Sequence, residues 1–139
     1  MSKVAVVYWS GTGNTEAMAN KVAEGAKAAG AEVEVISADD FDGTDISGFD
    51  GVAFGCPAMG DEELEDGEFE PFFSDLEGKL SGKKVALFGS YDWGDGEWMR
   101  KWEERMKEAG AEVVGTVIAN NEQGDEDQAN LAELAKKLV

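Results

Sequence analysis

A segment rich in glycine and hydroxyl side chains, residues 10–15, has the composition of a phosphate-binding loop. Its sequence is SGTGNT. Glycines let the backbone bend so that several N–H groups point at one anion, and the N-terminus of a following helix adds its positive end. The hydroxyls of Ser10, Thr12 and Thr15 and the side-chain amide of Asn14 supply further donors. The segment therefore predicts a site for a terminal phosphate monoester.

Three other phosphate sites do not fit this chain. Gly11 and Gly13 match the first two glycines of a dinucleotide-binding fingerprint, but Glu16 holds the place of the third and would crowd a pyrophosphate. A Walker A loop would continue with Gly-Lys-Ser or Gly-Lys-Thr, and neither follows. A Cys-x5-Arg phosphatase loop starting at Cys56 would need arginine where Glu62 stands. The pattern thus favours holding a phosphate over transferring one.

The composition removes further classes of function. The chain has 139 residues, the size of one domain at about 150 residues each, so we predict a single domain over residues 1–139. It has no histidine, which excludes Ser-His triads, His-ligated zinc and histidine general bases. A single cysteine excludes an intrachain disulfide and a cysteine-ligated cluster. Any redox chemistry would therefore need a bound organic cofactor, and we predict no metal site.

Acidic residues dominate the charge. The 12 basic and 30 acidic residues give a net charge of −18, which opposes unaided binding to nucleic acid or to an anionic membrane. Residues 28–78 contain 16 of the acidic residues and no lysine or arginine. This stretch is either a solvated surface or the footprint of a basic partner. Self-repulsion favours a monomer, and the apolar run at residues 4–9 is too short for a signal peptide or membrane span, so we expect a cytoplasmic protein.

Strand-like and helix-like segments alternate along the chain. These elements must position the predicted phosphate loop at residues 10–15. Apolar or alternating runs predict strands at residues 4–9, 32–35, 51–54, 85–88 and 113–118. Helical spacing predicts helices within 18–29, 69–80, 98–109 and 131–138, the first and third ending at Gly30 and Gly110. This alternation is typical of a doubly wound α/β fold, with helices on both faces of a parallel sheet. The second strand alternates as edge strands do, which favours the strand order 2-1-3-4-5.

The strand order also locates the site. In open α/β sheets, ligands bind at the carboxyl ends of the strands where the strand order reverses. Here that point lies between the first and third strands, and the loops that meet there are residues 10–15, 56–67 and 90–96.

In these loops the chain resembles the short-chain flavodoxins of the clostridial type, and the resemblance runs from end to end. The matching motifs are YWSGTGNTE at residues 8–16, AMGDE at 58–62, LFGSY at 87–91 and WGDG at 93–96. The resemblance implies a flavodoxin-like five-stranded sheet, non-covalently bound FMN and one-electron transfer at low potential, between the semiquinone and hydroquinone. It implies a carrier without substrate turnover of its own. Its partners would be reductases and iron–sulfur enzymes with basic surfaces.

The resemblance also implies the cofactor-binding residues. They are Ser10, Gly11, Thr12, Gly13, Asn14 and Thr15 in the first loop, Pro57, Ala58, Met59, Gly60, Asp61 and Glu62 in the second, Ser90, Tyr91, Asp92, Trp93 and Gly94 in the third, and Asn121 after the fifth strand. The first loop would hold the phosphate. Met59 and Trp93 would cover the two faces of the isoalloxazine ring.

Two residues of the second loop would tune the potential in this family. The peptide after Gly60 can reorient at low cost because glycine tolerates both conformations, and its carbonyl would then accept a hydrogen bond from the reduced flavin N5–H. Glu62 would accept from the flavin N3–H. The three loops contain no lysine or arginine to neutralise an anionic reduced flavin, which predicts a low second potential.

Two positions depart from the clostridial pattern. Asp92 stands where that pattern has glycine, and its carboxylate either points to water or lowers the second potential further. Pro57 offers neither an N–H nor a hydroxyl to the phosphate. Trp98 and Trp102 are interpreted as core or partner surface rather than flavin contacts, and Trp9 is expected to pack beneath the site.

A second function uses the same fold. An FMN-dependent NAD(P)H or quinone reductase would also carry these loops, but it needs contacts for a second substrate. No arginine in the three loops is available to hold the phosphates of a nicotinamide nucleotide. An interaction domain without FMN would leave Met59 and Trp93 without a purpose.

Overall fold

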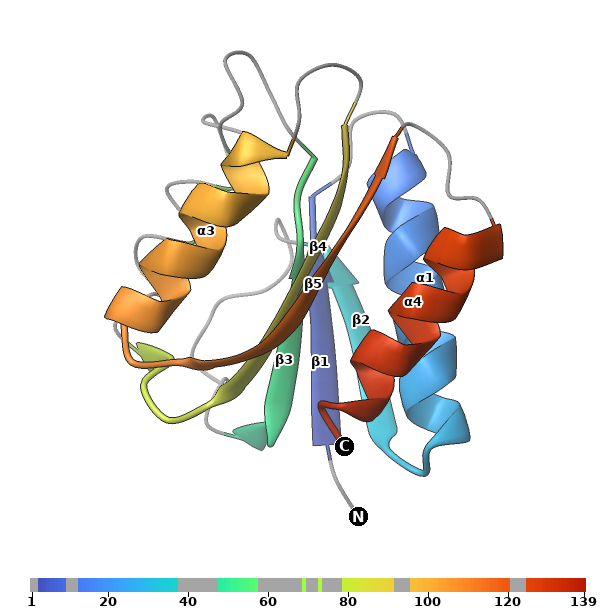
Figure 1. Ribbon diagram of the computed structural model, residues 1–139. Helices are drawn as coiled ribbons and strands as arrows, with labels where there is room; N and C mark the ends of the chain where they lie inside the picture. Colours follow the sequence, from blue (N-terminus) through green and yellow to red (C-terminus); the bar gives the residue numbers. More distant parts are fainter. Residues whose placement is uncertain are drawn as a thin grey trace.

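The computed structural model describes residues 3–9, 13–37, 48–57, 69, 73, 79–91, 96–120 and 125–139. Its strands are β1 (Lys3–Tyr8), β2 (Glu32–Ser37), β3 (Gly51–Gly55), β4 (Lys84–Tyr91) and β5 (Glu112–Asn120). Its helices are α1 (Asn14–Ala28), α3 (Glu97–Glu108) and α4 (Asp125–Lys136). Helix α1 connects β1 to β2, α3 connects β4 to β5, and α4 follows β5, as the sequence predicts (Figure 1).

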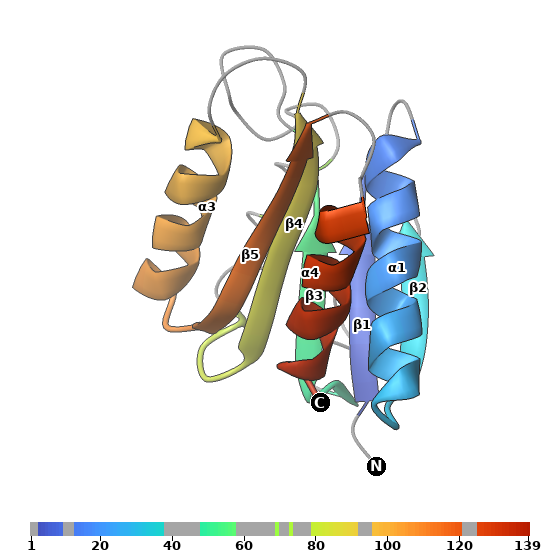
Figure 2. The same cartoon turned by 45° about the vertical axis from the view of Figure 1, so that its right-hand side comes forward.

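The strands form one parallel sheet in the order β2-β1-β3-β4-β5. The predicted strand order is therefore confirmed. Helices α1 and α4 cover one face of the sheet and α3 covers the other, which is plain when the molecule is turned (Figure 2). The predicted fold class, a doubly wound α/β sheet, is confirmed as well.

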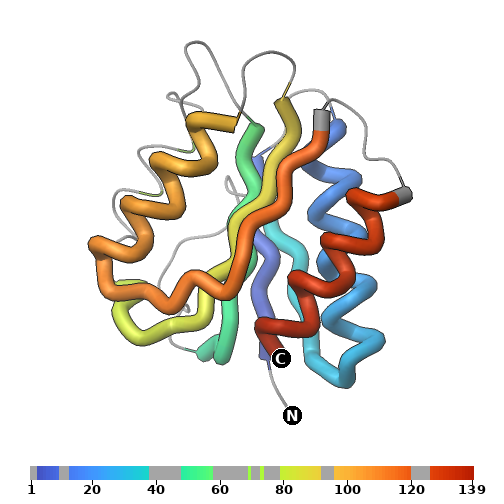
Figure 3. The backbone as a smooth tube through the Cα atoms, in the orientation of Figure 1, coloured from blue at the N-terminus to red at the C-terminus, as the bar shows by residue number. Residues whose placement is uncertain are grey.

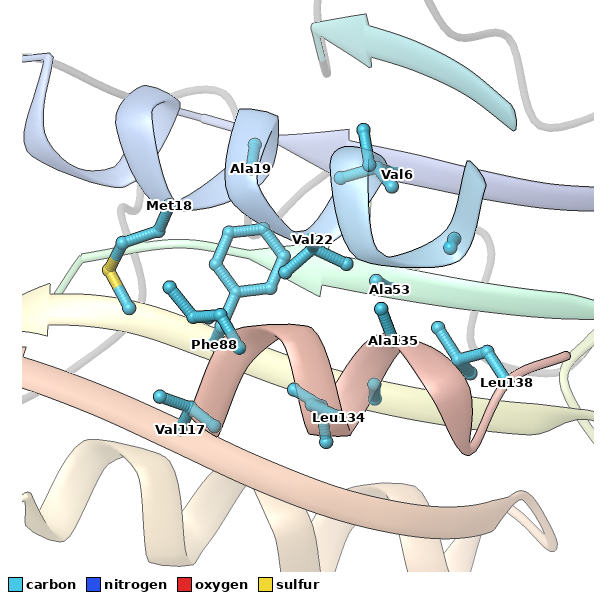
Figure 4. Close-up of a cluster of buried hydrophobic side chains, with 14 of the residues drawn as sticks. Val6, Met18, Ala19, Val22, Ala53, Phe88, Val117, Leu134, Ala135 and Leu138 are labelled. Carbon is cyan, nitrogen blue, oxygen red and sulfur yellow. The ribbon is translucent and has the colours of Figure 1, made fainter. Parts of the chain in front are cut away.

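Each face of the sheet has its own hydrophobic core. Between the sheet and the helix pair α1–α4, Met18, Val22 and Leu134 pack around the ring of Phe88 (Figure 4). The other core lies under α3 and is mainly aromatic. Its largest members are Phe54, Phe69, Phe73, Trp98 and Trp102, all fully or almost fully buried. The alternation of side chains along β4 divides its residues between the two cores.

The core under α3 tests two sequence predictions, one about Trp98 and Trp102 and one about the helix within residues 69–80. Trp98 and Trp102 are each 1% exposed, so they belong to the core and not to a partner surface. Phe69 and Phe73 are helical and buried, in agreement with the helix predicted within 69–80, and their rings stack with centroids 5.7 Å apart. Leu80 is also buried but lies outside any helix.

The two edge strands of the sheet are β2, whose edge position its alternating sequence predicts, and β5. β2 exposes Glu32, Glu34 and Val35, and Val35 is 39% exposed. At the other edge, β5 carries one extra residue, because Val85 and Ala86 of β4 are paired with Val113 and Gly115. The carboxylates of β2 and the irregularity of β5 both discourage pairing with another chain.

All strands point the same way, so their carboxyl ends share one edge of the sheet, which we call the carboxyl edge. Helices α1 and α3 begin at this edge, whereas the chain ends at Val139 at the opposite, amino edge (Figure 3). The carboxyl ends of β1, β3 and β4 are therefore neighbours. Within the described residues, no helix is long and apolar enough to cross a membrane.

Candidate cofactor site

Six of the predicted cofactor residues lie in the described part of the chain. Gly13, Asn14 and Thr15 open α1, Pro57 follows β3, and Ser90 and Tyr91 end β4. The rest lie outside the described residues: Ser10, Gly11, Thr12, Ala58, Met59, Gly60, Asp61, Glu62, Asp92, Trp93, Gly94 and Asn121. Neighbouring strand ends and the start of α1 thus bring residues from all three predicted loops to the carboxyl edge.

Two boundaries differ from the sequence prediction. Asn14 and Thr15 belong to the first turn of α1, and Ser90 and Tyr91 belong to β4 rather than to a loop. The ladder continues because Ser90 and Tyr91 are paired with Ala119 and Asn120 of β5. The run of apolar residues in β4 ends at Phe88, so hydrophobicity alone gave no sign of this extension.

The N-terminus of α1 is capped by glycine. Gly13 has a φ of 95°, a left-handed conformation that side chains disfavour, and its carbonyl accepts the N–H of Ala17 at 3.0 Å. Glycine has no side chain to bond the N–H groups of the first turn, and Glu16 in that turn is exposed. A helix N-terminus of this kind presents N–H groups and the positive end of the helix dipole, as an anion site requires.

A buried hydroxyl pair joins α1 to β4. Thr15 Oγ1 and Ser90 Oγ are 3.0 Å apart, and the two residues are 1% and 4% exposed. They are the only buried residues with a hydroxyl or charged side chain in the described part of the chain. The pair ties the predicted phosphate site to the end of the strand that leads into the third loop.

The end of β3 is held on two sides. The N–H of Cys56 donates to the Phe88 carbonyl at 3.2 Å, and Trp98 Nε1 donates to the Cys56 carbonyl at 3.1 Å. Gly89 lies so close that an added Cβ would come within 2.2 Å of the Cys56 carbonyl oxygen. Only glycine fits there, and the backbone that enters the second predicted loop is fixed. The sequence analysis left Trp98 as core or partner surface and missed this bond. The need of a buried indole N–H for an acceptor was the available signal.

Aromatic side chains pack under this edge. Tyr91 is half-buried, and its ring lies 5.7 Å from that of Trp98 at 48°. Trp9 follows β1, donates its N–H to the Gly55 carbonyl at 2.9 Å and packs against the core under α3. Cys56 is fully buried, and its thiol donates a 3.5 Å hydrogen bond to the Pro57 carbonyl.

Among the described residues, positive charge is concentrated at the amino edge of the sheet, opposite the predicted cofactor site. Lys3 and Lys84 begin β1 and β4, Lys83 precedes β4, and Lys27, Lys107 and Lys136 lie in the last turns of α1, α3 and α4. Strand starts and helix ends share the amino edge (Figure 1). Near the carboxyl edge, Arg100 and Lys101 lie early in α3, and Lys101 pairs with Glu97 at 3.7 Å.

Neither a metal centre nor the groove beside β5 coincides with the predicted cofactor residues in the described part of the chain. The described residues contain no cluster of histidine, cysteine, aspartate and glutamate that could hold a metal ion. A groove of about 270 Å³ lies between β5 and α4, and Gly115, Val117, Leu134 and Lys137 are among its lining residues. No predicted cofactor residue lines it.

Comparison with known proteins agrees with the fold and with the sequence motifs. The flavodoxin family model matches residues 6–135. The flavodoxin of Megasphaera elsdenii is 58% identical over 117 residues, which cover 84% of this chain and 85% of that protein. The flavodoxin of Clostridium beijerinckii is 49% identical over 134 residues, which cover 96% of this chain and 97% of that protein.

A solved structure supports the same assignment. The solution structure of two-electron reduced Megasphaera elsdenii flavodoxin superposes with a TM-score of 0.90 at 52% identity, over 97% of each chain. The resemblance inferred from the loop motifs is therefore confirmed, and the reductase alternative is not favoured. The chain belongs to the flavodoxin family, whose members bind FMN and carry electrons rather than turn over a substrate.

Proposed function

We propose that this chain is a low-potential one-electron carrier that cycles bound FMN between its one- and two-electron reduced forms. We also propose that it works as a cytoplasmic monomer with one domain over residues 1–139. The observation that carries the proposal is the convergence of the α1 N-terminus and the ends of β3 and β4 where the strand order reverses. The related Megasphaera elsdenii flavodoxin has been solved in its two-electron reduced form, which agrees with such a cycle.

The described residues suit the phosphate of FMN. The glycine cap leaves the first-turn N–H groups of α1 without a competing side chain from the cap position, and the Thr15 hydroxyl lies beside them. Backbone N–H groups and a hydroxyl at a helix N-terminus match a phosphate, which has only acceptor oxygens. Ser10, Thr12 and Asn14 would complete this site.

The remaining loops would hold the ring. FMN, when bound, supplies the chemistry of accepting and donating single electrons. Met59 and Trp93 would pack against its two faces and exclude water, and Glu62 would bind N3–H. The Gly60 carbonyl would accept from N5–H once that proton is present. The fixed backbone at Cys56 gives the loop carrying Met59 and Gly60 a rigid start.

The charge distribution supports basic redox partners. The stretch at residues 28–78 holds 16 acidic residues and no basic one, and the net charge of the chain is −18. Among the described residues, lysines gather at the amino edge, so a positively charged partner would meet less repulsion at the carboxyl edge. Salt shortens the Debye length from about 10 Å at 0.1 M to about 3 Å at 1 M, so association with a basic reductase should slow as salt is added. A rate that does not depend on salt would count against steering by charge.

An anaerobic redox titration of the FMN-loaded chain tests the function. We expect two separate one-electron steps with the second at much lower potential, and no rapid bleaching of the flavin by NADPH alone. A single two-electron step, or fast bleaching by NADPH, would favour the reductase. A purified chain that binds no FMN would remove both functions.

A further inference from the structure

The hydroxyl pair of Thr15 and Ser90 connects residues 75 positions apart. Thr15 lies in the first turn of α1, and Ser90 is the last residue but one of β4. Phe88, two residues before Ser90, belongs to the core under α1 and α4, so Ser90 points from the sheet to the same side. Both residues are buried, so water has little access to their hydroxyl oxygens.

Either hydroxyl can donate in this pair, and the choice matters for an anion. Each hydroxyl has one hydrogen and two acceptor positions. If Thr15 donates to Ser90, no hydrogen of Thr15 remains for a phosphate. If Ser90 donates to Thr15, the single hydrogen of Thr15 is left for a phosphate oxygen, which can only accept.

We propose that Ser90 is a positioning residue for the phosphate of the cofactor, acting through Thr15. Its hydroxyl donates to Thr15 Oγ1, and so commits the hydrogen of Thr15 to the phosphate. The inference rests on the proposed FMN site and changes one part of it: Ser90 supports the phosphate from behind Thr15 rather than contacting the cofactor. The extended β4, whose pairing with β5 continues to Tyr91, holds Ser90 in place.

This arrangement makes a selective prediction. Ser90→Ala removes the donor and leaves Thr15 free to turn its hydrogen elsewhere, so the affinity for a phosphate-bearing flavin falls. The loss should be about fivefold in Kd, the equivalent of one ordinary hydrogen bond. Riboflavin has the same ring without the phosphate and should lose less than about twofold.

The test measures Kd for FMN and for riboflavin on the full-length apoprotein by flavin fluorescence. Wild type, Ser90→Ala, Ser90→Thr, Thr15→Val, the double variant Thr15→Val with Ser90→Ala, and Ser81→Ala are compared. Ser81 is an exposed hydroxyl residue before β4 and serves as the control. The ratio of the two Kd values is the readout, because a partly unfolded variant changes both constants equally and leaves their ratio intact.

We expect Ser90→Ala to lower the riboflavin-to-FMN ratio of Kd by about three- to fivefold and Ser81→Ala to leave it unchanged. Thr15→Val should lower the ratio further, and adding Ser90→Ala to it should change nothing more, because Ser90 acts through Thr15. Ser90→Thr retains the hydroxyl and should keep the ratio near the wild-type value.

Three results would overturn the inference. In the first, Ser90→Ala leaves the ratio unchanged. In the second, the Ser90 and Thr15 effects add, which would mean that they act independently. In the third, Ser90→Thr lowers the ratio as much as Ser90→Ala. A wild-type chain that binds riboflavin as tightly as FMN would instead remove the proposed phosphate site itself.

Discussion

The indole Nε1 of Trp98 donates a 3.1 Å hydrogen bond to the carbonyl oxygen of Cys56, which joins α3 to the end of β3. The bond is buried, and its acceptor belongs to the residue before Pro57, where the second predicted loop begins. Trp102, one turn further along α3, is equally buried, but its Nε1 has no hydrogen-bond partner in the described structure. Trp98 and Trp102 therefore allow the contribution of the indole hydrogen bond to be separated from the contribution of ring packing.

Trp98→Phe is expected to destabilise the fold more than Trp102→Phe. Both substitutions shrink a buried aromatic ring, but only the first leaves a buried carbonyl without its indole donor. The difference in the free energy of unfolding should be roughly 1–3 kcal/mol. Urea denaturation followed by circular dichroism measures it. Equal losses would mean that the Trp98 bond contributes nothing beyond packing.

Gly89→Ala is expected to separate β3 from β4 at the carboxyl edge. The new Cβ would lie 2.2 Å from the Cys56 carbonyl oxygen, which is backbone and cannot rotate away. The cost should be at least about 1–3 kcal/mol, the usual range for overpacking. Gly48→Ala is the control, because its Cβ would meet nothing within 4 Å. Thermal unfolding of both variants decides, and equal melting temperatures would contradict the close approach.

Gly60→Ala is expected to lower the first reduction potential of the bound flavin. A side chain hinders the peptide after residue 60 from turning its carbonyl toward the flavin N5–H. The loss of one hydrogen bond of ~1 kcal/mol corresponds to about 40 mV for one electron. Potentiometric titration gives the value, with Gly48→Ala as the reference variant. An unchanged first potential would refute a role for Gly60.

If the Asp92 carboxylate points to water, the first of the two interpretations given for it above, Asp92→Gly is expected to leave the second potential unchanged. It would restore the residue that the clostridial pattern has at this position. The same potentiometric titration measures the effect. A clear rise in the second potential would show that the carboxylate acts on the reduced flavin.

The fold was accessible from the sequence because its signals are local. Continuous apolar strands, the alternating β2 and the glycines at positions 30 and 110 predict the topology and the helix ends. The link between Thr15 and Ser90 was not accessible, since it depends on how far β4 and β5 stay paired and on the register of α1 against the sheet. The Trp98 bond and the extra residue in β5 also arise from tertiary packing, for which the chain has no periodic signal.

The full burial of Cys56 turns the only thiol of the chain into a reporter of local opening. A thiol reagent can reach Cys56 only when the end of β3 opens locally. The labelling rate therefore reports how often this local opening occurs. Cys56 stands one residue before Pro57, at the start of the second proposed cofactor loop. The ratio of the labelling rates without and with FMN would therefore measure how much FMN binding stabilises the closed state of the carboxyl edge against local opening.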